Sequence, residues 1–364
     1  MSTAAPAWEI ARQFDFGAPL REVRTHGHGL INDTYLVTLA TTPPRHAILQ
    51  RINSRVFPQP QHIMQNLRSL LDHAQCATAK ISQRDALQLP GLYRARDGHD
   101  FSLDVDGNYW RALHFIENTR ALDRLANSTQ AHNIGRALGG FHALLNELPA
   151  EKLHTTLPGF HIAPDYLAHF DTVSTHACVD SLAAPACDFV ATRRALVATL
   201  ERGKHSGALP LRATHGDPKL DNFLFDARSD RVMSLIDLDT VQPGLIHYDL
   251  GDCLRSCCNR SGEAAHDPEA TQFDLEYCTA ILRGYVDTAR GFLTGPDFDF
   301  MYDAIRLLPF ELGLRFLTDH LEGDVYFKTQ VLGQNLHRAR VQFQLTKCIE
   351  QHEAAIRDVI AALR

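Results

Sequence analysis

The first part of the chain alternates between apolar and polar residues with the period of two that is typical of β-strands. The segments LREVRTHGHGL and NDTYLVTLA follow this pattern at 20–40, and HAILQRI is a third apolar run after a turn at 41–44. Further strands are predicted within 89–116, where D-G and D-G-N mark turns. Between these groups, VFPQPQHIMQNLRSLLDHA begins with prolines and then takes a helical period. We therefore expect a small antiparallel sheet with one helix.

The pattern changes after Glu117. NIGRALGGFHALLNEL has the period of an amphipathic helix, and similar stretches lie around 188–202, 272–292, 299–321 and 336–363. A sheet followed by helices predicts an α+β protein of two lobes. We place the first lobe at 1–116 and the second at 117–364, with the junction near 114–119. A length of 364 residues agrees with two such units.

Composition excludes several classes of protein. Lys and Arg number 36 against 43 Asp and Glu, a net charge of −7, and the absence of a basic run argues against binding to duplex nucleic acid, although not against a bound nucleotide. We find no secretory signal and no membrane-spanning stretch, and therefore expect a cytoplasmic protein. The eight cysteines are scattered without a C-x-x-C motif, which favours reduced thiols over disulfides or zinc.

Candidate chemistry is concentrated in THGDPKLDNFLFD, at 214–226. Asp217 and Asn222 are five residues apart, as are the Asp and Asn of the protein-kinase catalytic loop. In phosphoryl transfer such an Asp accepts the proton of the attacking hydroxyl, while the Asn helps to hold Mg²⁺. The apolar run VMSLI then leads to Asp237, and Mg²⁺ prefers hard oxygen ligands of this kind.

A simpler interpretation is a turn, because Asp, Asn, Pro and Gly are ordinary turn residues. The further motifs D-x-D, with Asp237 and Asp239, and HYDLGD at 247–252 favour chemistry over a plain turn.

HGDPKLDN, LIDLDT and YDLGD together resemble the aminoglycoside phosphotransferase and choline kinase family of small-molecule kinases. The resemblance covers nearly the whole chain, strongly at 213–252 and weakly in the first lobe, and it implies a two-lobed protein-kinase-like fold with ATP as phosphate donor. It further implies that Asp217 is the catalytic base, that Asn222 and Asp237 bind Mg²⁺, and that Asp239 lies near the metal or the substrate. His215 and Asp249 are expected to brace the loop.

The nucleotide-binding residues are expected in the first lobe. HGHGLINDTYLV is placed where a phosphate-covering loop would lie, although a two-glycine match also fits an ordinary hairpin turn. The strand HAILQRI ends in Gln50 and Arg51 where a Lys is expected, and the next helix offers Gln65 and Asn66 in place of its Glu partner. The planar cation of Arg51 is therefore the expected phosphate ligand. The complete set of nucleotide-binding candidates is Gly27, Gly29, Asn32, Thr34 and Arg51, with the backbone of His114 to Ile116 expected to meet adenine.

The acceptor is expected to contact the second lobe. Residues 300–317 are apolar almost all round, which predicts a buried helix, and the guanidinium of Arg315 within it needs a partner or a ligand. Asp319, one turn further along, is the structural alternative as its partner. A cationic acceptor would require an acidic or aromatic cage, which a central Arg opposes.

Finer likeness concerns GLINDTYLV, ILQRINSRVF, LIDLDTVQPG and RFLTDHLEGDVYF. These segments resemble the N-acetylhexosamine 1-kinase branch, which phosphorylates the anomeric hydroxyl of N-acetylglucosamine or N-acetylgalactosamine. This resemblance implies that Arg315 and Tyr326 contact the sugar and that Asp217 faces its O1. The substrate-binding candidates are Asp217, Asp237, Asp239, Arg315, Asp319 and Tyr326.

Two other functions remain open on the sequence. One is a kinase for another small alcohol, such as homoserine, a methylthioribose-like sugar or an aminoglycoside. The other is a nucleotide-binding pseudokinase, which the irregular glycine loop and the missing Lys–Glu pair favour. The joint presence of Asp217, Asn222 and Asp237 argues against it, because a scaffold has no need of a base and a metal site.

Overall fold

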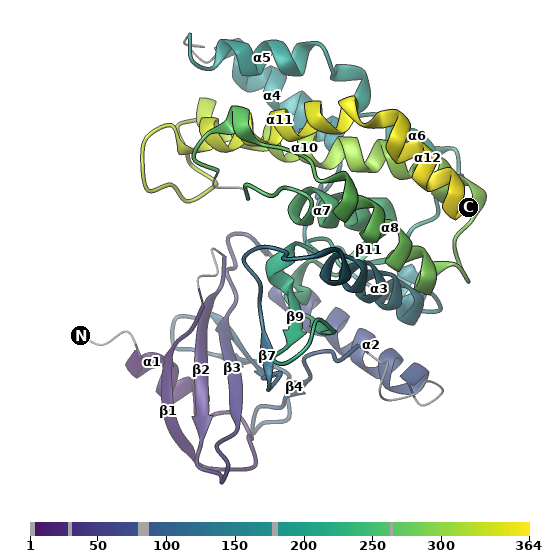
Figure 1. Ribbon diagram of the computed structural model, residues 1–364. Coiled ribbons are helices and arrows are strands. Elements are labelled where there is room, and N and C mark those ends of the chain that lie inside the picture. Colours follow the sequence, from purple (N-terminus) through teal and green to yellow (C-terminus); the bar gives the residue numbers. More distant parts are fainter. Residues whose placement is uncertain (1–3, 28–30, 79–86, 177–180, 263–264) are drawn as a thin grey trace.

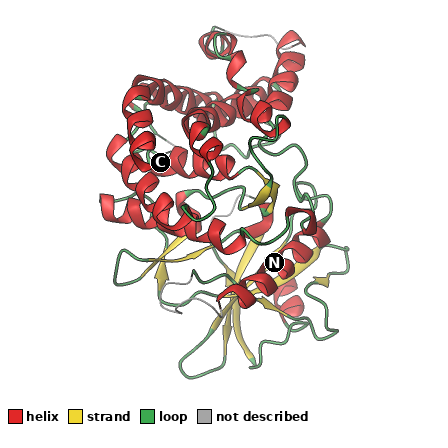
Figure 2. Ribbon diagram, turned by 90° about the vertical axis from the view of Figure 1, so that its right-hand side faces the viewer, coloured by secondary structure: helices red, strands yellow, loops and turns green. Residues whose placement is uncertain are grey.

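Strands and helices occupy different parts of the molecule. The computed structural model describes residues 4–27, 31–78, 87–176, 181–262 and 265–364. Figure 1 shows a sheet at one end, built from the purple and blue part of the chain, and a stack of helices at the other end. Figure 2 shows the same separation after a quarter turn. The predicted α+β architecture of two lobes is confirmed.

The N-terminal lobe is built on one antiparallel sheet. Its strands run in the spatial order β1-β2-β3-β6-β4, and β5 also pairs with β6. The strands are β1 (Leu20–Thr25), β2 (Asp33–Leu39), β3 (His46–Arg51), β4 (Leu92–Tyr93), β5 (Ser102–Leu103) and β6 (Tyr109–His114). The strands predicted at 20–52 and within 89–116 are therefore present.

The two faces of this sheet have different neighbours. Val37, Leu49 and Ala112 lie on one face and form a hydrophobic cluster with helix α1 (Ala4–Ala11). Because side chains alternate along a strand, Gln50 and Arg111 lie on the opposite face, and Arg111 reaches the helical lobe. Helix α1 was not predicted, since its sequence AAPAWEIA is short and carries no clear apolar stripe. The prediction of a single helix in this lobe is corrected by it.

Helix α2 (Pro60–Thr78) is the helix that the sequence predicted, and it is fixed to the second lobe. The side chain of Asn66 donates to the carbonyl oxygens of His154, at 2.7 Å, and Val241, at 2.8 Å. It also accepts a hydrogen bond of 2.7 Å from the backbone N–H of His154. In place of a Glu that pairs with a strand Lys, the helix therefore offers an amide that holds it against the backbone of the other lobe.

The C-terminal lobe consists of helices and short strands. The helices are α3 (Ser128–Leu145), α4 (Ala163–His176), α5 (Ala184–Ala191), α6 (Thr199–His205), α7 (Ile246–Cys257), α8 (Leu275–Ala289), α9 (Gly295–Asp299), α10 (Met301–Leu321), α11 (Gln334–Gln351) and α12 (Glu353–Leu363). The strands are β7 (Thr119–Arg120), β8 (Arg212–Thr214), β9 (Phe223–Asp226), β10 (Val232–Leu235) and β11 (Gln242–Gly244). β9 pairs with β10 and β7, and β8 pairs with β11.

The predicted helices are present with corrected bounds. The stretches at 272–292 and 299–321 are α8 and α10, whereas 336–363 divides at His352 into α11 and α12. The stretch at 188–202 spans α5, a short 3-10 turn and α6. Helices α4 and α7 were not predicted; α7 contains the HYDLGD segment, whose polar residues conceal its period.

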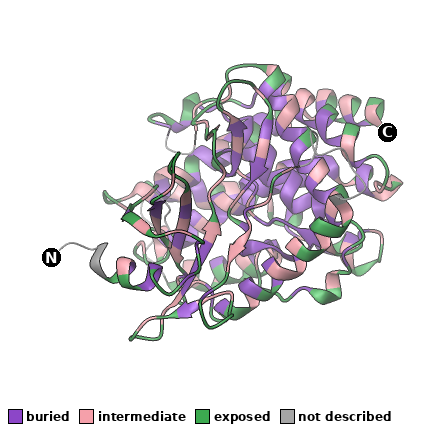
Figure 3. Ribbon diagram, turned by 90° about the horizontal axis from the view of Figure 1, so that it is seen from below, coloured by how far each residue is buried: buried purple, intermediate pink, exposed green. Residues whose placement is uncertain are grey.

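Helix α10 lies in the interior, as its apolar sequence predicted. Its buried residues are spread over most of its circumference, and in Figure 3 buried positions concentrate among the helices of this lobe. Its neighbours are α11, α7 and α4. Among the residues that the structure describes, no helix is both long enough and apolar enough to cross a bilayer.

Candidate active site

The loop that carries Asp217 connects β8 to β9 and begins with a sharp turn at Gly216. The φ angle of Gly216 is +88°, and a Cβ atom there would lie 2.8 Å from the carbonyl oxygen of Thr240. Only glycine adopts this conformation and this close approach without strain. The turn directs the chain from the end of β8 into the loop, which returns through a 3-10 turn at Leu220–Asn222 to β9.

Asp249 on α7 supports this loop through hydrogen bonds to its backbone, as the sequence predicted. Its two carboxylate oxygens accept hydrogen bonds from the backbone N–H groups of His215, at 2.6 Å, and Gly216, at 2.7 Å. His142 on α3, which sequence reasoning missed, donates a third hydrogen bond of 2.8 Å from Nε2. Although burial acts to raise the pKa of Asp249, these donors hold it below its usual value. A buried, ionised carboxylate therefore supports the turn.

His215 fixes the other side of the loop. Its Nε2 donates to the carbonyl oxygen of Ile236 at 2.9 Å, and its Nδ1 accepts from the backbone N–H of Asp217 at 3.2 Å. One nitrogen thus acts as donor and the other as acceptor, which is the pattern of a neutral ring. Burial lowers the pKa of His215, in agreement with that pattern. The predicted bracing role of His215 is confirmed.

Asp217 projects from the loop and is partly exposed. Its carboxylate accepts a hydrogen bond of 2.6 Å from Nζ of Lys219, a residue that the sequence analysis left without a role. Burial acts to raise the pKa of Asp217, but the ammonium of Lys219 outweighs it and holds the pKa below the usual value. Asp217 is therefore ionised at neutral pH and able to accept a hydrogen bond from a hydroxyl group.

Asn222 and Asp237 supply oxygen atoms beside Asp217. The amide nitrogen of Asn222 donates to the carbonyl oxygen of Asp217 at 2.7 Å, a bond that does not use its amide oxygen. Asp237 follows β10 in a left-handed conformation, with φ +65°, and is exposed. Desolvation by the surrounding protein atoms, and then the charges of Asp239 and Asp217, raise the pKa of Asp237 to about 6, although part of its side chain remains accessible to water. This pair of hard oxygen donors fits Mg²⁺, which keeps waters and phosphate oxygens as its other ligands.

Asp239 is buried and joins the two lobes. One of its oxygens accepts from the side chain of Asn32 at 2.7 Å, and the other contacts the guanidinium of Arg111. Asn32 was one of the predicted nucleotide-binding residues, whereas Arg111 was not singled out. The structure thus places Asp239 next to Asp237, with both of its oxygens bound to residues of the first lobe.

The remaining nucleotide candidates are spread along the sheet. Gly27 has φ +73°, whereas Gly29 lies outside the described residues. Thr34 on β2 accepts a hydrogen bond of 3.1 Å from the side chain of Gln50. At the junction of the lobes, the N–H of His114 donates to the carbonyl oxygen of Gly91, and the carbonyl of Ile116 accepts from the side chain of Thr119.

Arg51 occupies a different place from the one expected of a phosphate ligand. It is exposed at the end of β3 and donates from Nε to Asp33 of β2 at 2.9 Å. By strand alternation it shares the face of Leu49, which packs towards α1. The neighbouring Gln50 has the opposite orientation and lies on the face of Arg111. The expectation that Arg51 meets the phosphates therefore has no support from its position.

Arg315 on α10 is surrounded by aromatic rings. Its guanidinium carbon lies 5.0 Å from the ring centre of Tyr166, 5.4 Å from Phe327, 5.5 Å from Phe160 and 6.0 Å from Tyr326. No carboxylate of the described residues forms an ion pair with it. The cation is held by ring faces and keeps its N–H groups available.

Asp319 does not pair with Arg315, and the structural alternative proposed for it is wrong. Its carboxylate accepts from the backbone N–H groups of Tyr326, at 2.7 Å, and Phe327, at 2.9 Å, and from the side chain of Asn335 at 2.8 Å. Asp319 is buried and fixes the loop after α10. It thereby positions Tyr326, whose side chain is half exposed.

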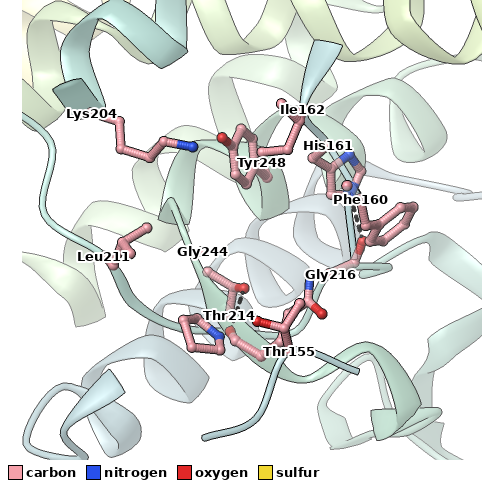
Figure 4. A pocket seen from close by; sticks show the side chains of 13 residues that line it. Thr155, Phe160, His161, Ile162, Lys204, Leu211, Thr214, Gly216, Gly244 and Tyr248 are labelled. Carbon is pink, nitrogen blue, oxygen red and sulfur yellow. Dashed lines mark hydrogen bonds between the residues drawn. The ribbon is translucent and has the colours of Figure 1, made fainter. Parts of the chain in front are cut away.

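A cavity of about 190 Å³ reaches the loop of Asp217 at Gly216 (Figure 4). Its lining includes Thr155, Lys204 and Tyr248. His161 and Gly216, which are hydrogen-bonded to each other at the start of the loop, also line it. Neither Asp217 nor Asp237 lines it. In Figure 4 a dashed line joins the ring of His161 to the backbone of Gly216, and both residues line the cavity.

Comparison with known proteins agrees with this geometry. Residues 22–285 match the model of the APH family, described as a phosphotransferase enzyme family. Among solved structures, a microcompartment-associated aminopropanol kinase is 17% identical over 96% of this chain and 98% of its own, with a TM-score of 0.62. An aminoglycoside phosphotransferase from Alicyclobacillus acidocaldarius is 15% identical over 98% of this chain and 96% of its own, with a TM-score of 0.61. An amicoumacin kinase in complex with AMP-PNP and Ca²⁺ is 12% identical over 95% and 94%, with a TM-score of 0.60.

The family match covers both the sheet and the loop of Asp217, and the similar structures share the fold over nearly the full length of the chain. With its two-lobed, protein-kinase-like fold and the acidic residues grouped around Asp217, this chain belongs to the APH phosphotransferase enzyme family.

Proposed function

We propose that this protein is an ATP- and Mg²⁺-dependent kinase that phosphorylates the anomeric hydroxyl of an N-acetylhexosamine, either N-acetylglucosamine or N-acetylgalactosamine. The observation that carries the choice of acceptor is Arg315, a guanidinium held by aromatic rings and unpaired among the described residues. Burial acts to lower the pKa of Arg315, but Tyr166, Glu311, Tyr326 and then Asp217 raise it above its usual value, so the guanidinium stays charged and lies within electrostatic reach of Asp217. An acceptor hydroxyl on Asp217 would therefore place the rest of the molecule near Arg315.

Asp217, Asn222 and Asp237 each have a separate role in the proposed reaction. Asp217 would accept a hydrogen bond from the acceptor hydroxyl and take up its proton as the oxygen attacks the γ-phosphate. Lys219 keeps that carboxylate ionised before the reaction. Asn222 and Asp237 would hold Mg²⁺, which offsets the negative charge of the phosphates. Asp249, His142 and His215 maintain the loop without touching a substrate.

A neutral polyol suits the acceptor side. Arg315 offers several N–H donors in a fixed plane, and the exposed ring of Tyr326 can lie against the apolar face of a sugar. A simple amine would be repelled by this guanidinium. The residue that favours a second candidate is Glu311, one of whose buried oxygens, Oε2, has no hydrogen-bond partner in the part of the chain that the structure describes. An alcohol that carries both an amine and a carboxylate, such as homoserine, could use Glu311 and Arg315 together.

ATP consumption against a panel of sugars and amino alcohols tests these acceptors directly. For an active sugar, phosphorus NMR of the product should show coupling of the phosphate to H1. A product phosphorylated at another position, or turnover of amino alcohols alone, would exclude the anomeric assignment.

The role of Asp217 is tested by Asp217→Asn. This variant should lose turnover by a factor of about 10³ or more while it still binds ATP, because the base is absent and the metal ligands remain. Asp221→Asn in the same loop, at an exposed position, is the matched control and should retain activity. Wild-type turnover by the Asp217 variant would refute the assignment.

The acceptor site is tested by Arg315→Ala. The KM for the sugar should rise by about tenfold or more, with little change in the KM for ATP. Arg306→Ala on the same helix removes an arginine that pairs with Asp303, and it should leave both constants unchanged. Equal effects of Arg315→Ala on sugar and ATP would indicate a structural arginine. A pseudokinase would instead show ATP binding in a thermal-shift titration without turnover of any alcohol.

A further inference from the structure

The strand β3 lacks the lysine that anchors nucleotide phosphates in kinases, and Gln50 stands at its end. In the antiparallel pairing of β3 with β6, Gln50 lies directly opposite Arg111. Side chains of directly opposed residues lie on the same face of a sheet, so Gln50 and Arg111 share the face that is turned to the second lobe. Thr34 of β2 is opposite Gln50 on the other side and completes a row across three strands.

This row holds the guanidinium of Arg111 in one orientation. The side-chain oxygen of Gln50 accepts from Nε of Arg111 at 3.1 Å and from Nη2 at 2.8 Å. The amide nitrogen of Gln50 donates in turn to Thr34 at 3.1 Å. A Lys at position 50 would fill the space of this acceptor with a second cation. The presence of Gln50 and that of Arg111 are therefore two parts of one arrangement.

Arg111 carries its charge in the interior, with a side chain that is 1% exposed. Nη2 contacts Asp239, but Nη1 is buried and has no hydrogen-bond partner among the described residues. A buried guanidinium N–H without an acceptor is costly, since it has lost its water without replacement. The unsatisfied group therefore marks a place where an acceptor oxygen from a ligand would bind.

The position of Arg111 favours a phosphate oxygen as that acceptor. Asp239, which it contacts, is two residues from Asp237, and Asn32 of the glycine-containing segment binds the other oxygen of Asp239. Arg111 therefore lies between the segment predicted to cover phosphates and the carboxylate proposed to hold their metal ion. The planar fork of an arginine matches the oxygens of a phosphate group.

We infer that Arg111 is the cation that binds the phosphates of the nucleotide, supplied from β6 in place of the missing β3 lysine, and that Gln50 orients it. The inference rests on the proposed function only in requiring that a nucleoside di- or triphosphate enters this cleft. It does not depend on which alcohol is phosphorylated.

The test compares ligands that differ in phosphate groups, measured by calorimetry without metal ions so that Mg²⁺ does not contribute. Wild-type protein should bind ADP more tightly than adenosine. Arg111→Met should weaken ADP binding by about 10- to 100-fold, the value of hydrogen bonds to a charged group, and change adenosine binding by less than threefold. Arg51→Met, an exposed arginine on the adjacent strand, is the matched control and should match wild type for both ligands.

The double variant Gln50→Lys with Arg111→Met should recover a large part of the ADP preference, because it returns a cation to β3. If Arg111→Met does not fold, Arg111→Gln combined with Asp239→Asn removes both buried charges, and Asp239→Asn alone is its control. The ADP-over-adenosine ratio should fall in the double variant and persist in the control.

An unchanged ratio in the Arg111 variants, or an equal loss of ADP and adenosine binding, would overturn the inference and leave Arg111 as a link between the lobes. Failure of wild-type protein to bind any nucleotide would instead contradict the proposed function itself.

Discussion

His161 donates a hydrogen bond from Nε2 to the carbonyl oxygen of Gly216, 2.7 Å away, immediately before the catalytic aspartate proposed here. Its other nitrogen, Nδ1, lies 2.9 Å from a carboxylate oxygen of Glu311. A carbonyl and a carboxylate only accept hydrogen bonds, so both ring nitrogens carry protons and the ring is an imidazolium. Burial works against this charge, but Glu311 and then Asp252 raise the pKa of His161 above its usual value.

This arrangement predicts an alkaline limb in the activity profile. The ion pair stabilises the folded loop fully below the ordinary histidine pKa of about 6.5, and its contribution is lost as the pH rises through the raised value. Glu311→Gln removes the main cause of the shift, so the fall in kcat at high pH should begin at a lower pH. We also expect the free energy of unfolding of this variant to be lower by about 1–3 kcal/mol.

A kcat profile measured from pH 5 to 10 checks this prediction. Glu322→Gln, which removes an exposed carboxylate paired with His169, is the control and should leave the profile unchanged. Coincident profiles for Glu311→Gln and wild type would mean that the ion pair does not govern the loop.

Two glycine substitutions should have opposite effects. Gly216→Ala places a methyl group 2.8 Å from the Thr240 carbonyl at a φ of +88°, so we expect a loss of about 1–3 kcal/mol in unfolding free energy and at least tenfold in kcat. Gly140→Ala on α3 meets nothing within 4 Å and should stabilise the helix by about 0.5–1 kcal/mol. Urea unfolding and initial rates measure both. A fully active Gly216→Ala enzyme would contradict the role given to this turn.

Asn66→Ala should loosen the attachment of α2. The variant loses two hydrogen bonds to carbonyl oxygens and one from a backbone N–H, all made by a buried residue, and we expect the free energy of unfolding to fall by about 3 kcal/mol. Gln65→Ala, at the exposed neighbouring position, should change stability by less than about 0.5 kcal/mol. Denaturant unfolding of the two variants tests this prediction. Equal midpoints would show that the hydrogen bonds of Asn66 contribute little to stability.

Acid sensitivity is predicted from His247. Its Nε2 donates to the carbonyl oxygen of Asp297 at 2.9 Å, and burial lowers its pKa to about 4. Between pH 6.5 and 4 the unfolded chain takes up a proton at this position that the folded chain does not, so stability falls as the pH falls. At ~1.4 kcal/mol per pH unit, the free energy of unfolding should fall by about 3 kcal/mol across this range.

His247→Gln should remove this part of the acid dependence, as measured by urea unfolding at several pH values. His99→Gln, at an exposed position, should keep the wild-type dependence. If stability of the His247 variant fell with pH as steeply as that of wild type, the assignment would be wrong.

The grouping of Asp217, Asn222 and Asp237 was predictable from the sequence because these residues are close together in the chain. Asp217 and Asn222 come from one loop, and Asp237 follows the next strand, so one hairpin presents all of them. Fold class was predictable for a related reason, since strand and helix periods are local properties.

The support of the site was not predictable in the same way. Arg111 meets Gln50 only through the register of two strands that are 61 residues apart in sequence. His161 lies in an irregular segment, in a left-handed conformation with φ +61°, and nothing nearby in sequence points to Glu311. Asp319 shows the converse error, because spacing along α10 suggested Arg315 as its partner while the following loop offered backbone N–H groups.

The attachment of α2 through Asn66 bears on how this enzyme is governed. In kinases where a Lys–Glu pair sets the position of this helix, swinging the helix outward separates the pair and silences the protein. Here the side-chain amide of Asn66 is hydrogen-bonded to main-chain atoms of His154 and Val241 in the other lobe. We therefore expect α2 to keep a single position, so that neither a partner protein nor phosphorylation would regulate the site by moving this helix. The arrangement suits an enzyme whose throughput follows the supply of its two substrates.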